Sequence, residues 1–72
     1  MTFGELLKKK RSESGLTQRK VGEKIGKPYQ YYQRWENGTA MPDFRTIKTL
    51  CRVLSITPQE AFDSIPDEEP RQ

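Results

Sequence analysis

Residues 17–38 constrain the fold of this chain more than any other segment. Two pairs of apolar residues in it have helical spacing, Val21 with Ile25 and Tyr32 with Trp35. Such spacing puts both members of a pair on one face, so each pair indicates a helix with one buried stripe. The first helix is predicted over residues 18–25 and the second over about residues 28–36. Gly26 lies between them, where a left-handed backbone is least strained without a Cβ.

Gly22 favours a close meeting of these two helices. It follows Val21 in the chain, and a larger side chain at this position would hold the helices apart. Two short helices that meet across a tight turn form a helix-turn-helix, whose second helix can enter a DNA major groove.

The segment also resembles a known family, the lambda-repressor-like, Cro-type helix-turn-helix family, also called XRE. The matching features are Gly15-Leu16-Thr17-Gln18, Gly22, Gly26, Tyr32, Trp35 and Glu36-Asn37-Gly38, followed by Pro42 and a further amphipathic helix. The resemblance covers about residues 3–63. It implies an all-α, five-helix bundle with the helix-turn-helix at helices 2 and 3, and it implies binding to double-stranded DNA.

Local signals place the other three helices. Thr2 with Glu5, and Thr57 with Glu60, have the spacing of capping boxes, which predict helix starts near residues 3 and 58. We therefore expect helices over about 3–14 and about 58–64, and a helix over about 44–54 that is capped by Asp43. In the last helix Phe62 is expected to pack against the core.

The domain organisation follows from these helices. Seventy-two residues allow one domain, which we place at residues 1–65. Residues 66–72 are polar, charged and interrupted by proline, so they are predicted to be a disordered acidic tail.

The charge is segregated along the chain. Residues 1–57 hold 12 Lys or Arg against 5 Asp or Glu, a net +7, whereas residues 58–72 hold 1 against 5, a net −4. A basic body favours a polyanionic partner. An ordinary solvated surface is the equal alternative on charge alone.

Composition argues against several other classes of protein. No apolar run approaches the roughly 20 residues of a membrane span, and the start of the chain lacks a signal-peptide pattern, so a cytoplasmic location is expected. The chain has no histidine and a single cysteine, Cys51. We therefore expect no metal site, no cofactor and no enzymatic activity.

The outward face of the second helix-turn-helix helix carries the candidates for reading DNA bases: Tyr29, Gln30, Gln33 and Arg34. Gln can pair bidentately with adenine and Arg with guanine, and the resemblance puts Tyr29, Gln30 and Arg34 at base-reading positions. Gln33 lies at the edge of that face. The alternative is an ordinary polar helix face.

Candidates for binding backbone phosphates flank that helix: Gln18, Lys27, Asn37, Thr39 and Arg45. Gln18 begins a helix, where free N–H groups and the helix dipole favour an anion. Lys27 and Pro28 depart from the family pattern of a small apolar residue followed by Ser or Thr, so Lys27 is expected to replace the missing phosphate contact. The alternative for Gln18 is an ordinary polar residue in the first turn of a helix, and the alternative for Asn37 and Thr39 is a turn that uses Asn-Gly for its positive φ. For Arg45 a solvated helix face is equally favoured.

Arg11 and Glu36 are interpreted as structural, because in the resembling family an arginine late in helix 1 pairs with the glutamate after helix 3. A bidentate Arg–carboxylate pair would fix one helix relative to the other.

These expectations point to a sequence-specific DNA-binding transcriptional regulator. One recognition helix reads only about a half-site, so we expect a weak homodimer, or a monomer that pairs on a two-fold symmetric operator. The apolar anchors for such a dimer would be Phe62, Ile65 and Met41. The alternative is an antitoxin-like or adaptor protein whose main partner is another polypeptide.

Overall fold

The described part of the chain, residues 1–66 of a computed structural model, consists of helices and their connections. Five helices occur in it: α1 (Phe3–Glu13), α2 (Gln18–Ile25), α3 (Tyr29–Asn37), α4 (Phe44–Leu54) and α5 (Pro58–Ser64). The all-α, five-helix prediction is therefore confirmed. The predicted disordered tail lies outside the described residues, apart from Pro66.

Side-chain caps begin four of the five helices in the described residues. Both capping boxes form: the Thr2 hydroxyl accepts from the Glu5 N–H at 3.1 Å, and the Glu5 carboxylate accepts from the Thr2 N–H at 2.8 Å. Thr57 and Glu60 repeat this arrangement at α5. Thr17 caps α2, and Asp43 caps α4. These bonds satisfy N–H groups that have no partner within a helix.

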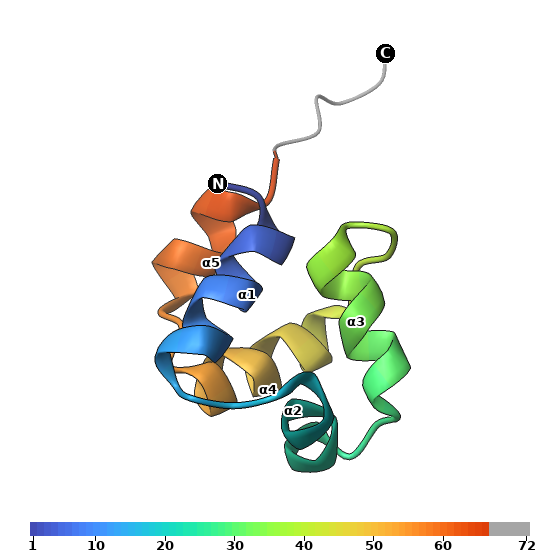
Figure 1. The fold of residues 1–72 in the computed structure, drawn as a ribbon. Coiled ribbons are helices and arrows are strands. Elements are labelled where there is room, and N and C mark those ends of the chain that lie inside the picture. The colour runs from blue at the N-terminus through green and yellow to red at the C-terminus, as the bar shows by residue number, and fades with distance from the viewer. Residues whose placement is uncertain (67–72) are drawn as a thin grey trace.

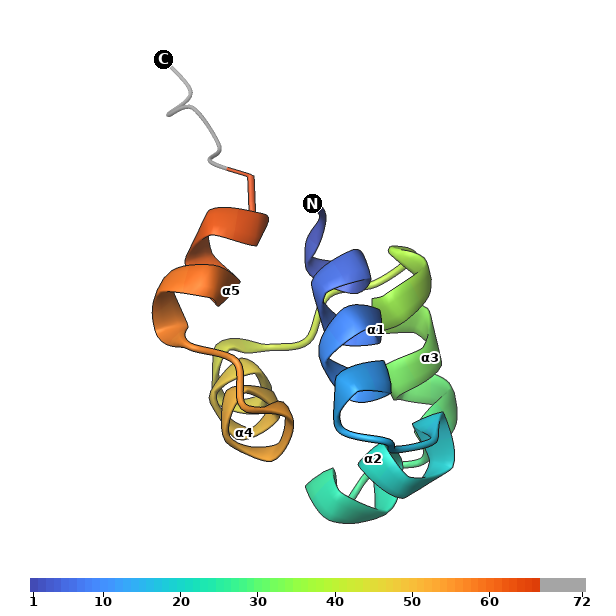
Figure 2. The same ribbon diagram turned by 60° about the vertical axis from the view of Figure 1, so that its left-hand side comes forward.

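α1 lies between α3 and α5 in both views of the fold (Figures 1 and 2). The core fills the space between these helices and α4, and its fully buried large side chains are Leu7, Val21, Tyr32, Leu50 and Leu54. The Tyr32 hydroxyl donates to the Leu7 carbonyl at 3.5 Å. The apolar stripe of α3 is thus held against α1, which leaves the opposite face of α3 outward.

The prediction that Phe62 packs against the core is wrong. Phe62 is 57% exposed, whereas its neighbour Ala61 is fully buried. α5 turns Ala61 and Ser64 inward, and the small Ala61 side chain allows this short helix to lie close to α1. Met41, expected as an apolar anchor of a homodimer, is exposed too, which is compatible with that expectation and does not test it.

Two glycines allow close helix contacts. A Cβ on Gly22 would lie 2.9 Å from the Lys27 carbonyl oxygen and 3.0 Å from the Tyr29 Cα, so Gly22 lets α2 and α3 meet as expected. A Cβ on Gly4 would lie 2.8 Å from the Trp35 carbonyl oxygen and would also overlap the Glu36 carbonyl. Gly4 therefore sets the approach of α1 to the end of α3, a role that the sequence does not reveal.

We expect Gly4→Ala to lower the thermal midpoint of unfolding. The change adds helix propensity of about 1 kcal/mol, but the new methyl group meets backbone atoms of α3, which cannot rotate away. Overpacking of this kind typically costs about 1–3 kcal/mol, and we expect it to outweigh the gain. Thermal unfolding by circular dichroism measures the balance. Ser12→Ala, on the exposed surface of α1, is the control and should unfold no earlier than wild type. A Gly4→Ala midpoint at or above that of wild type would contradict the assigned role.

Candidate nucleic-acid interface

A part-buried ion pair ties α1 to the last turn of α3. The Arg11 Nε donates to Glu36 Oε2 at 2.6 Å, and Arg11 Nη2 donates to Glu36 Oε1 at 3.2 Å. Arg11 Nη1 also donates to the Leu16 carbonyl at 3.0 Å. The Arg11 side chain is 16% exposed and the Glu36 side chain only 3%. This bidentate geometry fixes the orientation of α3 as well as its position.

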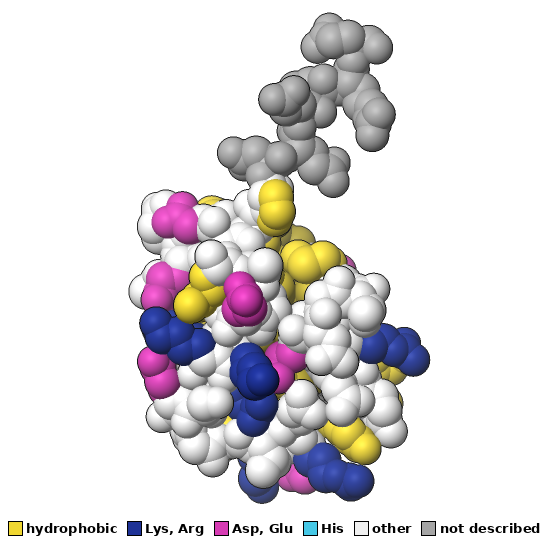
Figure 3. Space-filling model, turned by 45° about the horizontal axis from the view of Figure 1, so that its top comes forward, with side chains coloured by type: hydrophobic (Ala, Val, Ile, Leu, Met, Phe, Trp, Pro, Cys, Tyr) yellow, Lys and Arg dark blue, Asp and Glu magenta, His cyan; other side chains and the backbone are white. Residues whose placement is uncertain are grey.

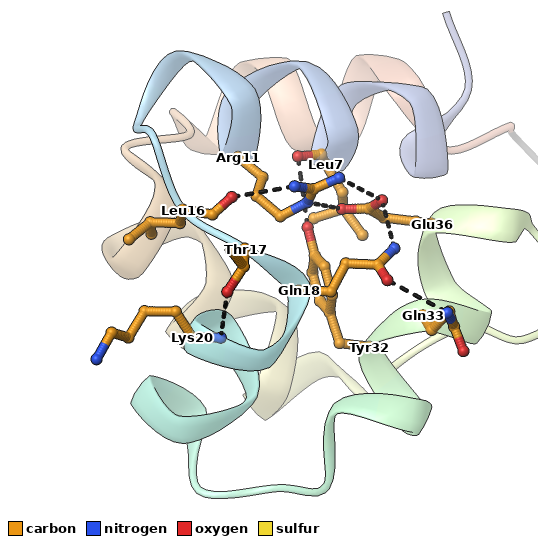
Figure 4. Close-up of polar contacts among 9 residues, drawn as sticks. All are labelled: Leu7, Arg11, Leu16, Thr17, Gln18, Lys20, Tyr32, Gln33 and Glu36. Atoms are coloured by element: carbon orange, nitrogen blue, oxygen red, sulfur yellow. Dashed lines mark hydrogen bonds and ion pairs between the residues drawn. The ribbon is translucent and has the colours of Figure 1, made fainter.

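Hydrogen bonds continue from this ion pair to the surface of α3 (Figure 4). The Gln18 Nε2 donates to Glu36 Oε1 at 3.0 Å, and the Gln18 Oε1 accepts from Gln33 Nε2 at 3.3 Å. Gln18 therefore connects α2 to two positions on α3, one buried and one exposed. Its side chain is oriented from both ends before any ligand arrives.

The surroundings of Glu36 keep it ionised. Burial alone would raise the pKa of its carboxyl group, but the hydrogen bonds from Arg11 and Gln18 contribute to holding that pKa below its ordinary value. The same carboxylate raises the pKa of Arg11 through its hydrogen bonds. Burial raises the pKa of Tyr32 beside them. The pair is thus charged throughout the neutral range.

α3 has two distinct faces. Its inner face contributes Tyr32 and Trp35 to the core, where their rings make an edge-to-face contact with centroids 6.2 Å apart. Its outer face exposes Gln30, Gln33 and Arg34, and Tyr29 at the start of the helix is half-buried. The Arg34 guanidinium lies 5.7 Å from the centre of the Tyr31 ring, within the range of a cation–π contact.

The predicted phosphate-binding residues lie at several places around α3. Lys27 is exposed before its first turn, Arg45 is exposed in the first turn of α4, and Asn37 and Thr39 are exposed where α3 ends. Two N–H groups in that last region already have partners, since Gly38 donates to the Trp35 carbonyl and Thr39 to the Arg34 carbonyl. The Thr39 hydroxyl also donates to the Arg34 carbonyl, at 3.3 Å.

α3 begins one residue later than expected. Pro28 has φ −55° and ψ 136°, so it precedes the helix as its N-cap, and it makes no side-chain cap hydrogen bond. A hydroxyl at this position could cap the helix, but a proline ring cannot. The α3 start therefore differs from the other four helix starts in the described residues.

Arg19 makes a contact with Tyr29 that the sequence analysis does not predict. Its guanidinium carbon lies 4.6 Å from the centre of the Tyr29 ring. This arrangement joins α2 to the first residue of α3, ten positions along the chain. Helical periodicity gives no signal for it, because the two residues belong to different helices.

Acidic and basic side chains are interspersed on the face drawn in Figure 3. Both kinds lie on the side formed by α1 and α5, and a basic side chain stands at the opposite edge, over α3. Within residues 1–66 no group of three or more acidic or cysteine side chains is arranged to hold a metal ion. No helix in that range is long and apolar enough to cross a membrane.

Comparison with known families identifies the class. A family model described as helix-turn-helix matches residues 7–60, which span all of α2, α3 and α4. The chain therefore belongs to the helix-turn-helix family, of the lambda-repressor-like, Cro type.

Two curated relatives, both from Bacillus subtilis strain 168, are similar to this chain. One is named SPbeta prophage-derived uncharacterized HTH-type transcriptional regulator YonR, and it is 36% identical over 55 residues, 76% of this chain and 51% of that protein. The other is named uncharacterized HTH-type transcriptional regulator YqaE, and it is 33% identical over 55 residues, 76% of this chain and 47% of that protein. The chain thus spans about half the length of these relatives. No solved structure is significantly similar to it.

Proposed function

We propose that this protein is a sequence-specific transcriptional regulator that binds double-stranded DNA and inserts α3 into the major groove. The observation that carries the proposal is the division of α3 into two faces. Tyr32, Trp35 and Glu36 are fixed against α1 and the core, while Gln30 and Arg34 are exposed on the outside. A rigid helix with outward amide and guanidinium groups meets the geometric needs of direct base readout.

The roles of the polar residues follow from their chemistry. Gln30 and Gln33 can pair with adenine, and Arg34 can pair with guanine through two parallel hydrogen bonds. Gln18, Lys27, Asn37, Thr39 and Arg45 are proposed to contact phosphates, which fix position without reading sequence. In a bacterial cell such as that of the named relatives, this function is exercised in the cytoplasm.

We also propose that two copies bind one operator. A single recognition helix covers about a half-site, so specific binding by a small domain usually requires two copies about 34 Å apart. An apolar groove of about 300 Å³ between α4 and α5 supports a weak homodimer. Phe44 and Phe62 line this groove and are 64% and 57% exposed.

The same groove favours one alternative function. An exposed apolar groove with two phenylalanines also suits a segment of a different polypeptide. An antitoxin-like or adaptor protein would use it in this way, with or without DNA binding.

Selection of bound sites from random duplex DNA, followed by sequencing, tests the proposal. We expect enriched inverted repeats whose half-sites are about one helical turn apart. Sedimentation with an enriched duplex should then show two chains per duplex, with the chain alone largely monomeric. Binding that enriches no sequence would overturn the sequence-specific function, and tight one-to-one binding to an unrepeated site would overturn the dimer. A chain that binds no duplex DNA at low salt would favour the adaptor.

A further inference from the structure

A shallow hollow of about 340 Å³ lies beside the turn that joins α2 to α3. Arg19 and Lys27 bring two positive charges to its lining, and Glu23 brings one negative charge. Glu23 is also paired with Lys20, at 3.4 Å on the exposed side of α2. The hollow therefore has a net positive charge and favours an anion.

Tyr29 holds the most versatile donor of this hollow in place. The Arg19 guanidinium lies 4.6 Å from the centre of the Tyr29 ring, so the ring attracts the cation through its face. A guanidinium over the face of a ring keeps N–H groups free, and their planar arrangement matches the oxygens of a phosphate. None of the ion pairs within residues 1–66 involves Arg19. Because the Tyr29 ring already restricts the Arg19 side chain, less side-chain freedom is lost when a ligand binds.

The position of this hollow indicates which anion it binds. In helix-turn-helix complexes the N-terminal residues of the second helix meet base edges, while the first helix crosses the DNA backbone. A residue of α2 that touches the first residue of α3 lies where the groove edge meets the backbone. We propose that Arg19, together with Lys27, binds a phosphate of the DNA backbone, and that Tyr29 is a positioning residue for Arg19. This inference rests on the proposed function and changes the expected role of Tyr29 from base reading.

Salt dependence of duplex binding tests the phosphate contact. Arg19→Ala should weaken binding to an enriched site and to unrelated duplex by a similar factor, because a phosphate carries no sequence information. It should also reduce the slope of log affinity against log salt by about 0.9, as expected for one lost phosphate contact. The ratio of wild-type to variant affinity should then rise about 3.5-fold when salt falls from 200 to 50 mM. Arg52→Ala removes the same charge from the last turn of α4, the end that leads toward α5 (Figure 1), and should leave the slope unchanged.

Phosphate-ethylation interference locates the contact on the DNA. Ethylation of one backbone phosphate should weaken binding of the wild type. Ethylation of the same phosphate should not weaken binding of Arg19→Ala. Tyr29→Phe keeps the ring and should bind like wild type, whereas Tyr29→Leu should lose affinity for all sequences alike. Glu23→Gln removes the opposing carboxylate and should strengthen binding.

The outcomes separate the two proposals. If wild type binds its site with the expected salt slope and Arg19→Ala has the same slope and the same interference pattern, the phosphate site is wrong and the regulator proposal stands. A change of base preference in Tyr29→Phe or Tyr29→Leu would return Tyr29 to base reading. If wild type binds no duplex, both proposals are overturned.

Discussion

Replacing Glu36 by alanine is expected to destabilise the fold by about 3 kcal/mol, because it leaves the Arg11 guanidinium part-buried without its partner. The Glu36 side chain is only 3% exposed, and it accepts hydrogen bonds from both Arg11 and Gln18. For a domain of this size each kcal/mol lowers the unfolding midpoint by about 4–8 °C. The unfolding midpoint of Glu36→Ala should therefore lie at least about 12 °C below that of wild type. Glu13→Ala, at the exposed end of α1, should shift the midpoint little.

An unchanged midpoint in Glu36→Ala, combined with lost DNA binding, would show that Glu36 acts in the DNA interface and not in the stability of the fold.

The pH dependence of stability gives a second measure of the role of Glu36. Because the folded-state pKa of Glu36 is lowered, its stabilising contribution is present above the unfolded value of about 4.3 and is lost as the pH falls through the folded value. Glu5, Asp43 and Glu60 have lowered pKa values too. Glu36→Gln should therefore lose less stability in acid than wild type. The loss that remains should come from the other carboxyl groups with lowered pKa values.

Replacing Arg34 by alanine is expected to reduce the preference for the enriched site over unrelated duplex by about 5- to 150-fold. A bidentate arginine–guanine contact contributes about 1–3 kcal/mol of discrimination, and Arg34 is exposed on the outer face of α3. Titration of both duplexes at one salt concentration measures this ratio. The fold should be unaffected, because the Arg34 side chain is exposed.

Lys27→Ala provides the contrast. It should weaken specific and non-specific binding alike and flatten the salt dependence, as a phosphate contact requires. If Arg34→Ala and Lys27→Ala weaken every duplex by the same factor, the distinction between base-reading and phosphate-binding residues does not hold.

Features set by neighbouring residues could be predicted from the sequence. The capping boxes at Thr2 and Thr57 depend on a side chain and a backbone group three residues apart, so the local pattern is sufficient. The turn at Gly26 is similar: its φ of 74° is a property of one residue. The apolar stripes of α2 and α3 could also be predicted, because the residues of each stripe lie within one helix.

Features set by the packing of separate helices could not be predicted in this way. α5 has one large apolar residue, Phe62, and the sequence assigned it to the core. α5 packs against both α1 and α4, and in this packing Ala61 lies inward instead. Gly4 meets carbonyls of α3 more than thirty residues away. The bonds from Gln18 to Glu36 and Gln33 likewise require the relative position of two helices.

The two-faced build of α3 has a consequence for how such a regulator can diverge. The inner residues Tyr32, Trp35 and Glu36 maintain the scaffold, while the side chains of Gln30 and Arg34 are exposed outside the core. Under the proposed function, substitutions at those outer positions can redirect the protein to a new operator while every variant along the way still folds. Gln33 is less free to vary, because it is bonded to Gln18. Under the proposed function, a lineage that carries this domain could acquire new target sites by exchanging two side chains, with the scaffold inherited intact.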